Sequence, residues 1–478
     1  MFETGVRQLR LALQMVRGRP IDARNVQRLI GDALATLEAF GSPGDDLQEM
    51  LDGPFSDPVA RRAFQEQALR RTARRLARRS PHYRAVFGAI DLDAKALTLQ
   101  DMAGIPVTTK AHLLDRPAAF VVEGSRPHVT TRTTGTTGRP VEVWLSRYEL
   151  ELWPALAALS GLLRGEIVPG DCMQINISSR ATAAMAQNMA VCRLVGASTR
   201  PLGLVPAAES LESLLSGGER APTLLATYPS YLAQLVSLAR REGLGPEDFR
   251  LRRVDCGGEV LSAALARAAR ETLGPVLVND TFGMTEVLPV SGRVCERGHL
   301  HHDLNMGYVE VVDLDTGEPA AAGALGSVVI TPYFPYRECM PVFRYDTRDL
   351  VRRLPDGELT CSLAGTPATS RILGKADHLL RVDGRVVTSR ELVEACEALP
   401  GEPWPARFRA SAHADTLRLT VGQDTAAGLG ADELARRIVL DDRGLPLVCD
   451  VADASASTRL RPLRADLVEH TFTAAKRS

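Results

Sequence analysis

Between Leu113 and Val351 the sequence alternates short β-rich runs with longer segments rich in Ala, Leu and Arg. The runs include Val141–Leu145, Thr223–Thr227 and Ser327–Ile330. Strands that alternate with helices in this way form layered α/β domains, in which the helices cover the faces of the sheets. The alternation therefore predicts an α/β fold with mixed β-sheets flanked by helices.

A chain of 478 residues has room for about three domains, and the sequence pattern suggests where they begin and end. Residues 1–57 have helical spacing with breaks at Gly18-Arg19-Pro20 and Gly41-Ser42-Pro43-Gly44, and they are expected to form a helical N-terminal extension. The large α/β domain is expected to cover residues 58–371. Residues 372–478 are expected to form a small α+β C-terminal domain that acts as a mobile lid.

The composition excludes several classes of protein. A formal net charge of −1 gives no general attraction to nucleic acid or to an anionic membrane. The longest apolar stretch, Leu150–Leu163, is too short to span a bilayer and contains Glu151 and Pro154. Charges interrupt the apolar runs near the N-terminus, so no signal peptide is expected. The protein is predicted to be cytoplasmic, and its eight cysteines to be thiols or metal ligands.

A turn rich in hydroxyl groups and glycines runs from Arg132 to Pro140, with the sequence RTTGTTGRP. Glycines let the backbone approach a ligand closely, and the threonine hydroxyls add uncharged donors, so such a turn can hold phosphate oxygens. It lacks the spacing of a Walker loop, which argues against an ordinary P-loop nucleotidase. Taken alone, it could equally be a plain hairpin between two strands.

Three further segments follow in order: Asp280–Glu286 (DTFGMTE), Arg344–Asp349 (RYDTRD) and Arg371–Asp377 (RILGKAD). Together with the Thr/Gly turn they resemble the ordered motifs of the adenylate-forming superfamily of acyl-CoA ligases, luciferases and peptide-synthetase adenylation domains. Shorter segments narrow the branch, because they are similar to those of phenylacetate–coenzyme A ligases. These segments are Ser80–Arg84 (SPHYR), Ile105–Lys110 (IPVTTK) and Met340–Tyr345 (MPVFRY). The resemblance covers roughly residues 58 to 400.

The resemblance implies a set of residues that bind ATP and Mg²⁺. The residues expected to line the triphosphate are Thr133, Thr134, Gly135, Thr136, Thr137 and Gly138. Thr285 would contact the α-phosphate, Glu286 would hold Mg²⁺, and Asp349 would accept the ribose hydroxyls. The remaining residues expected around the nucleotide are Gly257, Gly258, Glu259, Asp280, Phe282 and Gly283. The large domain would thus be an AMP-binding domain, and the lid would rotate about a hinge near Asp377.

Two positions depart from the family pattern. Lys375 stands where most members have arginine, so a catalytic contact there would keep its charge and lose the bidentate fork. Near the C-terminus the family has a lysine that reaches the site during adenylation, and the nearest match here is Leu463-Arg464-Ala465. Arg464 is the catalytic candidate that replaces this lysine, since a guanidinium also stabilises developing negative charge on phosphate.

Cysteine and histidine spacing suggests a second site. The predicted set is Cys295, His301, Cys339 and Cys361, and relatives of this branch often carry a similar arrangement. Three thiolates and one imidazole are a common ligand set for structural Zn²⁺. The alternative is that these are buried, inert thiols.

The sequence therefore predicts an ATP-dependent, AMP-forming ligase that adenylates an aromatic carboxylic acid and transfers the acyl group to coenzyme A. The acid is expected to bind between the Thr285-Glu286 loop and the helices around Trp144 to Gln187, with Tyr228 and Tyr231 as wall or core residues. One alternative is a specialised-metabolism enzyme with another substrate or acceptor, such as an amide synthetase, a carrier-protein loading enzyme or a nitrite-adenylating diazotase acting on an aryl amine. The other is a nucleotide-binding protein that does not turn over. The sequence leaves open whether the protein forms a homodimer.

Overall fold

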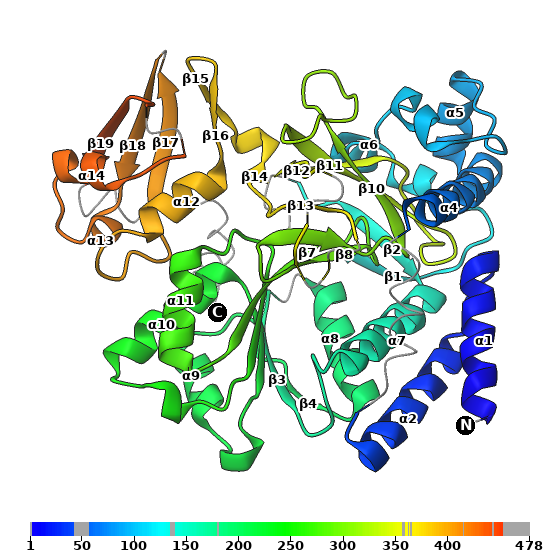
Figure 1. Ribbon diagram of the computed structural model, residues 1–478, viewed down its shortest axis with the longest axis horizontal. Coiled ribbons are helices and arrows are strands. Elements are labelled where there is room, and N and C mark those ends of the chain that lie inside the picture. Colours follow the sequence, from blue (N-terminus) through cyan, green and yellow to red (C-terminus); the bar gives the residue numbers. More distant parts are fainter. Residues whose placement is uncertain are drawn as a thin grey trace.

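The computed structural model describes residues 2–42, 57–133, 139–178, 181–355, 359–361, 363, 366–413, 415–441 and 444–452 (Figure 1). Among these residues no helix has both the length and the apolar character needed to cross a bilayer. The chain folds into mixed sheets flanked by helices, as the alternating pattern predicted.

An eight-stranded sheet forms the centre of the large domain, in the order β13-β9-β8-β7-β6-β5-β3-β4. Strands β3, β4, β5, β6 and β7 run parallel to one another. Strands β8, β9 and β13 continue the sheet with antiparallel pairing. The strands are β3 (Cys172–Asn176), β4 (Ser198–Arg200), β5 (Leu224–Thr227), β6 (Arg253–Gly257), β7 (Leu277–Gly283), β8 (Ser291–Val294), β9 (His299–His302) and β13 (Ala368–Ser370). The change from parallel to antiparallel pairing falls after β7, where the Thr285-Glu286 turn begins.

Helices cover this sheet, with α7 and α8 on one side and α9, α10 and α11 on the other (Figure 1). Their bounds are α7 (Arg147–Leu163), α8 (Thr182–Val195), α9 (Ala207–Leu215), α10 (Pro229–Arg241) and α11 (Ala263–Leu273). Helix α7 begins with a capping box, in which Ser146 and Glu149 satisfy each other's backbone N–H groups. Strands β3 and β5, at the middle of the parallel part, are buried along their whole length, as expected for parallel strands covered on both faces.

A second, antiparallel sheet stands beside the first in the order β10-β11-β12-β14. It comprises β10 (Gly307–Val312), β11 (Leu325–Pro332), β12 (Tyr345–Arg352) and β14 (Gly374–Lys375). A separate hairpin joins β1 (Pro127–Arg132) to β2 (Glu142–Ser146). Strands β12 and β14 place two of the sequence motifs next to each other, because Asp349 pairs with Lys375 across the ladder.

The N-terminal residues form helices that end where the sequence predicted breaks. Helices α1 (Phe2–Arg17) and α2 (Ala23–Phe40) precede α4 (Pro58–Arg79), α5 (Pro81–Ala89) and α6 (Lys110–Asp115). Buried side chains of α2, including Val26, Leu29 and Ile30, belong to the same hydrophobic core as those of the large domain. The predicted extension is therefore packed on the body of the protein, and α2 lies against α7.

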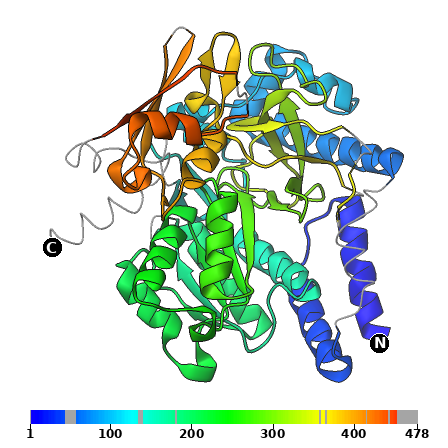
Figure 2. The same cartoon turned by 60° about the vertical axis from the view of Figure 1, so that its left-hand side comes forward.

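The C-terminal residues build a second hydrophobic core from Val382 to Cys449. It contains β15 (Leu380–Val382), β16 (Arg385–Val387), α12 (Ser389–Glu397), β17 (Phe408–His413), β18 (Thr416–Val421), α13 (Gln423–Ala426), α14 (Ala431–Arg437) and β19 (Leu447–Val451). In Figures 1 and 2 these elements lie together at one end of the molecule, above α11. The boundary at residue 372 and the mobility of this part stay predictions.

Helix α12 carries the contacts between the two cores. Arg390 pairs with Asp280 in the middle of β7 (3.2 Å) and donates to the Leu261 carbonyl (2.8 Å). Glu394 accepts the backbone N–H of Ala263 (2.9 Å), and Glu397 accepts the Ser262 hydroxyl (2.5 Å). Burial raises the pKa of Glu397 to about 7, although the Ser262 and Ala406 hydrogen bonds oppose the shift.

This raised pKa predicts a pH dependence of stability. A carboxyl group whose pKa is higher in the folded than in the unfolded protein contributes stability below its unfolded pKa and loses it as pH rises through the folded value. Between pH 5.5 and 8.5 the wild type should therefore lose roughly 2 kcal/mol relative to the Glu397→Gln variant, at about 1.4 kcal/mol per pKa unit. Urea unfolding midpoints of both proteins at each pH measure this difference. An identical pH trend in the two proteins would contradict it.

Candidate active site and metal centre

The three short segments that identify the branch meet in one hydrogen-bond network. The Tyr83 hydroxyl lies 2.8 Å from Thr108 Oγ1 and accepts the Phe343 N–H at 2.7 Å. Thr108 Oγ1 in turn donates to the Phe343 carbonyl at 2.8 Å. Backbone bonds between Thr108 and its neighbours Arg344 and Asp346 complete the contact. The side chains of Tyr83, Thr108 and Phe343 are buried, so this network fixes the start of β12 against the segment before α6.

Glu286 lies in a helical turn directly after β7, where the N–H groups of Val287 and Leu288 bond to the Met284 carbonyl. Its side chain is only 6% exposed. Burial raises the pKa of Glu286, and the nearby charges of Lys375 and Lys110 oppose the shift. A hydrogen bond joins this carboxyl to Tyr345, whose own pKa is raised mainly by burial. The two lysine charges thus favour the ionised form of this buried carboxyl group, which is the form that ligates Mg²⁺.

Asp349 and Lys375 form a buried pair on adjacent strands. Lys375 Nζ donates to Asp349 Oδ2 and to the Thr347 carbonyl, both at 2.8 Å. The N–H of Asp349 bonds to the Thr347 hydroxyl, so the irregular middle of β12 is held from both sides. The lysine therefore orients the carboxylate that was predicted to bind ribose. The roles of both residues at the nucleotide stay predictions.

The Gly257-Gly258-Glu259 segment ends β6 close to the Tyr228 ring. A Cβ atom at Gly257 would lie 2.8 Å from Thr281 Oγ1, and Gly258 has φ +80° with the Tyr228 ring 3.3 Å from the same position. Close approach of Thr281 therefore favours glycine at position 257, and the left-handed backbone favours it at position 258. Glu259 accepts hydrogen bonds from the N–H (2.8 Å) and hydroxyl (3.0 Å) of Ser230 at the start of α10.

The DTFGMTE segment sends its side chains in different directions. Asp280 points to Arg390 of α12, and burial raises the pKa of Asp280 while Arg390 and Arg371 oppose the shift. Phe282 is buried with its ring edge-on to His302, at 5.5 Å between centroids. Gly283 has open space where a Cβ would lie, and Thr285 is partly buried. Asp280 thus joins the two cores, a role that the motif alone did not indicate.

The Thr/Gly turn joins the antiparallel strands β1 and β2, as the hairpin interpretation of its sequence predicted. Thr133 is anchored by two bonds to Val141, one through its N–H and one through its hydroxyl, each at 2.9 Å. Arg464 lies outside the described residues. So do the other five residues predicted to bind phosphate, which are Thr134, Gly135, Thr136, Thr137 and Gly138.

The two tyrosines proposed as pocket or core residues differ in position. Tyr231 is fully buried, and its hydroxyl donates to the Val205 carbonyl at 2.7 Å, so it is a core residue. The Tyr228 hydroxyl accepts the Ser178 N–H, and its ring covers Gly258. Tyr228 therefore lies between the segment predicted to border adenine and the end of β3.

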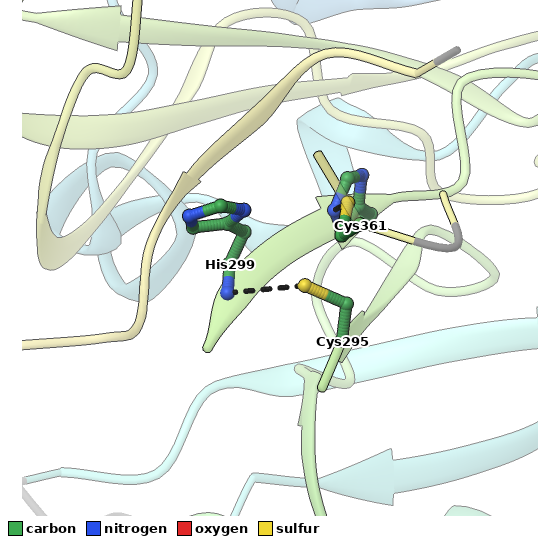
Figure 3. Close-up of side chains that lie close together, drawn as sticks. Cys295, His299 and Cys361 are labelled. Atoms are coloured by element: carbon green, nitrogen blue, oxygen red, sulfur yellow. Dashed lines mark hydrogen bonds between the residues drawn. The ribbon is translucent and has the colours of Figure 1, made fainter. Parts of the chain in front are cut away.

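Four side chains gather at the β8–β9 turn and form a candidate metal centre. The ligand atoms of Cys295, His299, His301 and Cys361 all lie within 4.8 Å of one another. Figure 3 shows the Cys295 sulfur facing the backbone N–H of His299, which donates to it at 3.3 Å. His301 Nδ1 bonds to the Thr366 hydroxyl (2.8 Å), and Nε2 lies 3.4 Å from Cys361 Sγ.

These residues fit a metal ion on chemical grounds. His299 Nδ1 is buried and has no hydrogen-bond partner among the described residues. Burial lowers the pKa of His301 to about 4, so its imidazole is neutral at pH 7, which is the form that ligates metals. Thr366 holds the other ring nitrogen, as a supporting residue does in many zinc sites. Two thiols and two imidazoles at these distances match a tetrahedral Zn²⁺ site.

The structure corrects the predicted ligand set at one position. Cys339 lies elsewhere: its N–H bonds to Glu149 (3.1 Å), and its thiol accepts from the Ser125 hydroxyl (3.8 Å). His299 takes its place in the cluster. Strand periodicity could have revealed this, because residues two apart on a strand point to the same face and His299 and His301 are so spaced.

Comparisons with known proteins agree with this architecture. A family model described as AMP-binding enzyme matches residues 118–333. The phenylacetate–coenzyme A ligase of Aromatoleum evansii is 27% identical over 81% of this chain and 87% of its own length. The ligase of the same name from Thermus thermophilus is also 27% identical, over 80% and 86%.

A solved structure shows the same fold. The crystal structure of 2-hydroxyisobutyryl-CoA ligase in the postadenylation state, in complex with 2-HIB-AMP, superposes with a TM-score of 0.71 at 21% identity. The match covers 88% of this chain and 93% of that one. Residues 118–333 thus match the AMP-binding enzyme family, and over about four fifths of its length the chain is similar to phenylacetate–coenzyme A ligases.

Proposed function

We propose that this protein is an ATP-dependent, AMP-forming ligase that adenylates an aromatic carboxylic acid and passes the acyl group to coenzyme A. The observation that carries the proposal is the buried group of Glu286, Tyr345, Asp349 and Lys375, which the turn after β7 and strands β12 and β14 bring together. Relatives named phenylacetate–coenzyme A ligase, aligned over about four fifths of the chain, support the substrate class and the acceptor.

In the first half-reaction a carboxylate oxygen of the acid attacks the α-phosphorus of ATP, and the bond to pyrophosphate breaks. Asp349, oriented by Lys375, accepts the ribose hydroxyls, and the Thr/Gly turn receives the triphosphate. Mg²⁺, held by Glu286, would neutralise charge on the phosphates. In the second half-reaction the thiol of coenzyme A attacks the acyl carbon, AMP leaves, and the thiol proton passes to solvent.

The proposal is tested by measuring pyrophosphate release from ATP with a panel of aryl acids, amino-aryl acids and nitrite. A stimulated release with aryl acids, followed by acyl-CoA formation when coenzyme A is added, supports it. Release of ADP would refute the family chemistry itself. Release with nitrite alone, or transfer to an amine in place of coenzyme A, would favour the alternative enzyme with another substrate or acceptor.

We also propose that the Cys295, His299, His301 and Cys361 cluster binds one structural Zn²⁺. Four protein ligands would fill a tetrahedral shell and leave no position for water, so the ion would not take part in the reaction. It would join the β8–β9 turn to the segment before β13, at the edge of the large sheet that follows the Glu286 turn.

Elemental analysis of protein purified without added metal should find close to one zinc per chain. The Cys361→Ser variant should lose most of the metal, because three remaining ligands bind Zn²⁺ much more weakly. The Cys339→Ser variant is the matched control and should keep it, since this thiol lies outside the cluster. Equal loss in both variants, or a wild type without zinc, would reject the site.

A further inference from the structure

Helix α1 carries a row of exposed apolar side chains. Val6, Leu9, Leu13 and Val16 are 51, 60, 40 and 59% exposed. The opposite face of the same helix is packed, because Leu11 is fully buried in the main core and Met15 packs against it. Large apolar residues that are exposed singly are common, but four in one row on one helix mark an interaction surface. We call this row the α1 stripe.

The helix is held firmly in place, so the α1 stripe is a preformed surface. Arg7 pairs with Asp32 of α2 at 2.6 Å, and Asn25 donates to the Arg7 carbonyl at 3.0 Å. Arg71 of α4 donates to the Val16 carbonyl at 3.2 Å at the C-terminal end. A surface that is ordered before binding loses little conformational entropy when a partner docks.

The spacing of the stripe points to another helix as the partner. Its residues are three, four and three positions apart, which is the a/d pattern of a coiled-coil seam. The seam is bordered on one side by the small residues Gly5 and Ala12, which permit a close approach. On the other side lie Glu3 in the first turn, Arg10 in the middle and Arg17 in the last turn.

We propose that the α1 stripe is the interface of a homodimer in which two α1 helices pack antiparallel. An antiparallel pair brings Leu9 next to the partner's Leu13 and Val6 next to the partner's Val16, so every residue of the stripe is covered. It also brings Glu3 near the partner's Arg17, and the two-fold symmetry repeats this pair at the other end of the seam. Arg10 would meet its own copy at the centre, but its charge is already compensated by Asp22 at 3.0 Å.

A parallel pair would lose these charge contacts, because the charged side of one helix would then face the Gly5 and Ala12 side of the other. A lipid surface is a poorer occupant as well. Helices that lie on membranes present a broad apolar face with basic flanks, whereas this seam is narrow and has Glu3 on its border. The described surface therefore fits a second copy of the chain better than either alternative.

The first test is the mass of the full-length protein in solution, by light scattering across a dilution series. The wild type should approach twice the 51.7 kDa of one chain at high concentration. Leu9→Glu places a charge in the seam and should raise the dissociation constant by about tenfold or more. The side chain is mostly exposed in one chain, so the circular dichroism spectrum should not change. A wild type that stays monomeric, or a Leu9→Glu variant that stays dimeric, would overturn the proposal.

A charge reversal tests the antiparallel orientation separately. Arg17→Glu should weaken the dimer, because the new carboxylate would face the partner's Glu3. Adding Glu3→Arg in the same chain should restore association, since the complementary pair is re-formed with its sign reversed. Failure of this rescue would overturn the antiparallel arrangement. Flotation with vesicles of phosphatidylglycerol and phosphatidylethanolamine tests whether the α1 stripe binds lipid instead. If the wild type stays monomeric but binds the vesicles, and Leu9→Glu abolishes this binding, the stripe is a lipid-binding surface and the homodimer proposal is overturned.

Discussion

Replacement of Glu286 by glutamine is expected to reduce ATP-dependent pyrophosphate release by about 10²–10³-fold, the loss typical when one preorganised group is removed from a transition-state site. Glutamine keeps the size of the side chain and removes the charge that would hold Mg²⁺. The structure supports this assignment because Glu286 is buried beside Lys110, Lys375 and Tyr345, where an ionised carboxyl group has charge partners. Steady-state pyrophosphate release measured across a Mg²⁺ titration checks the prediction.

The matched control is Glu318→Gln, which changes an exposed carboxylate on the loop after β10 and should leave the rate unaltered. Both variants should retain the wild-type circular dichroism spectrum, because glutamine replaces glutamate without a change of volume. Wild-type release from Glu286→Gln, with unchanged Mg²⁺ dependence, would remove Glu286 from the metal site. It would leave the fold assignment intact.

Replacement of Glu149 by alanine is expected to destabilise the protein by about 3–5 kcal/mol, the usual cost of breaking a buried ion pair by removing one partner. The side chains of Glu149 and Arg337 are both fully buried, 3.7 Å apart. Glu149 also accepts the N–H groups of Ser146 (2.7 Å), Glu338 (2.8 Å) and Cys339 (3.1 Å). Alanine would leave these three donors without their acceptor and the guanidinium without its charge partner.

The guanidinium has few alternatives once Glu149 is gone. Arg337 Nε donates to the Met340 carbonyl at 3.1 Å, but Nη1 and Nη2 are buried without a hydrogen-bond partner among the described residues. Burial lowers the pKa of Arg337, and Glu149 is the main charge that opposes this. The variant therefore loses the principal group that compensates a buried cation.

Urea denaturation measures this effect as a lower midpoint. The control is Glu151→Ala, two residues further along the same helix, where an exposed carboxylate pairs with Arg147 at 2.7 Å. A surface pair of this kind contributes at most about 1 kcal/mol. Similar midpoints for the two variants would show that the buried pair adds no more than the surface pair does.

Much of the fold could be predicted because its signals are local. Apolar runs separated by helical segments indicated the α/β class, and the breaks at Gly18 and Gly41 marked the ends of α1 and α2. Gly41 ends α2 in a left-handed conformation (φ 73°), which glycine adopts without strain. Such features depend on a residue and its near neighbours, so the sequence carries them directly.

The site was predictable only in part. The motifs located Glu286, Asp349 and Lys375, but the bond between Tyr345 and Glu286 and the pairing of Lys375 with Asp349 depend on the register of β12 and β14. Asp280 belongs to a nucleotide motif, yet in the structure it pairs with Arg390, more than a hundred residues away. A motif gives the type of residue at a position, whereas the direction of its side chain follows from the strand that carries it.

The sequence by itself indicated the likeness to adenylate-forming ligases and the order of the chemical groups, because spaced hydroxyls, glycines and carboxylates form motifs that depend only on near neighbours in the chain. Only the tertiary structure decided that His299 and not Cys339 completes the candidate metal cluster, that α2 packs on α7, and that the α1 stripe is left exposed. Each of these outcomes depends on distances of a few ångströms between residues far apart in the chain. Hydrophobic packing and strand register set such distances, and neither can be read from one segment alone.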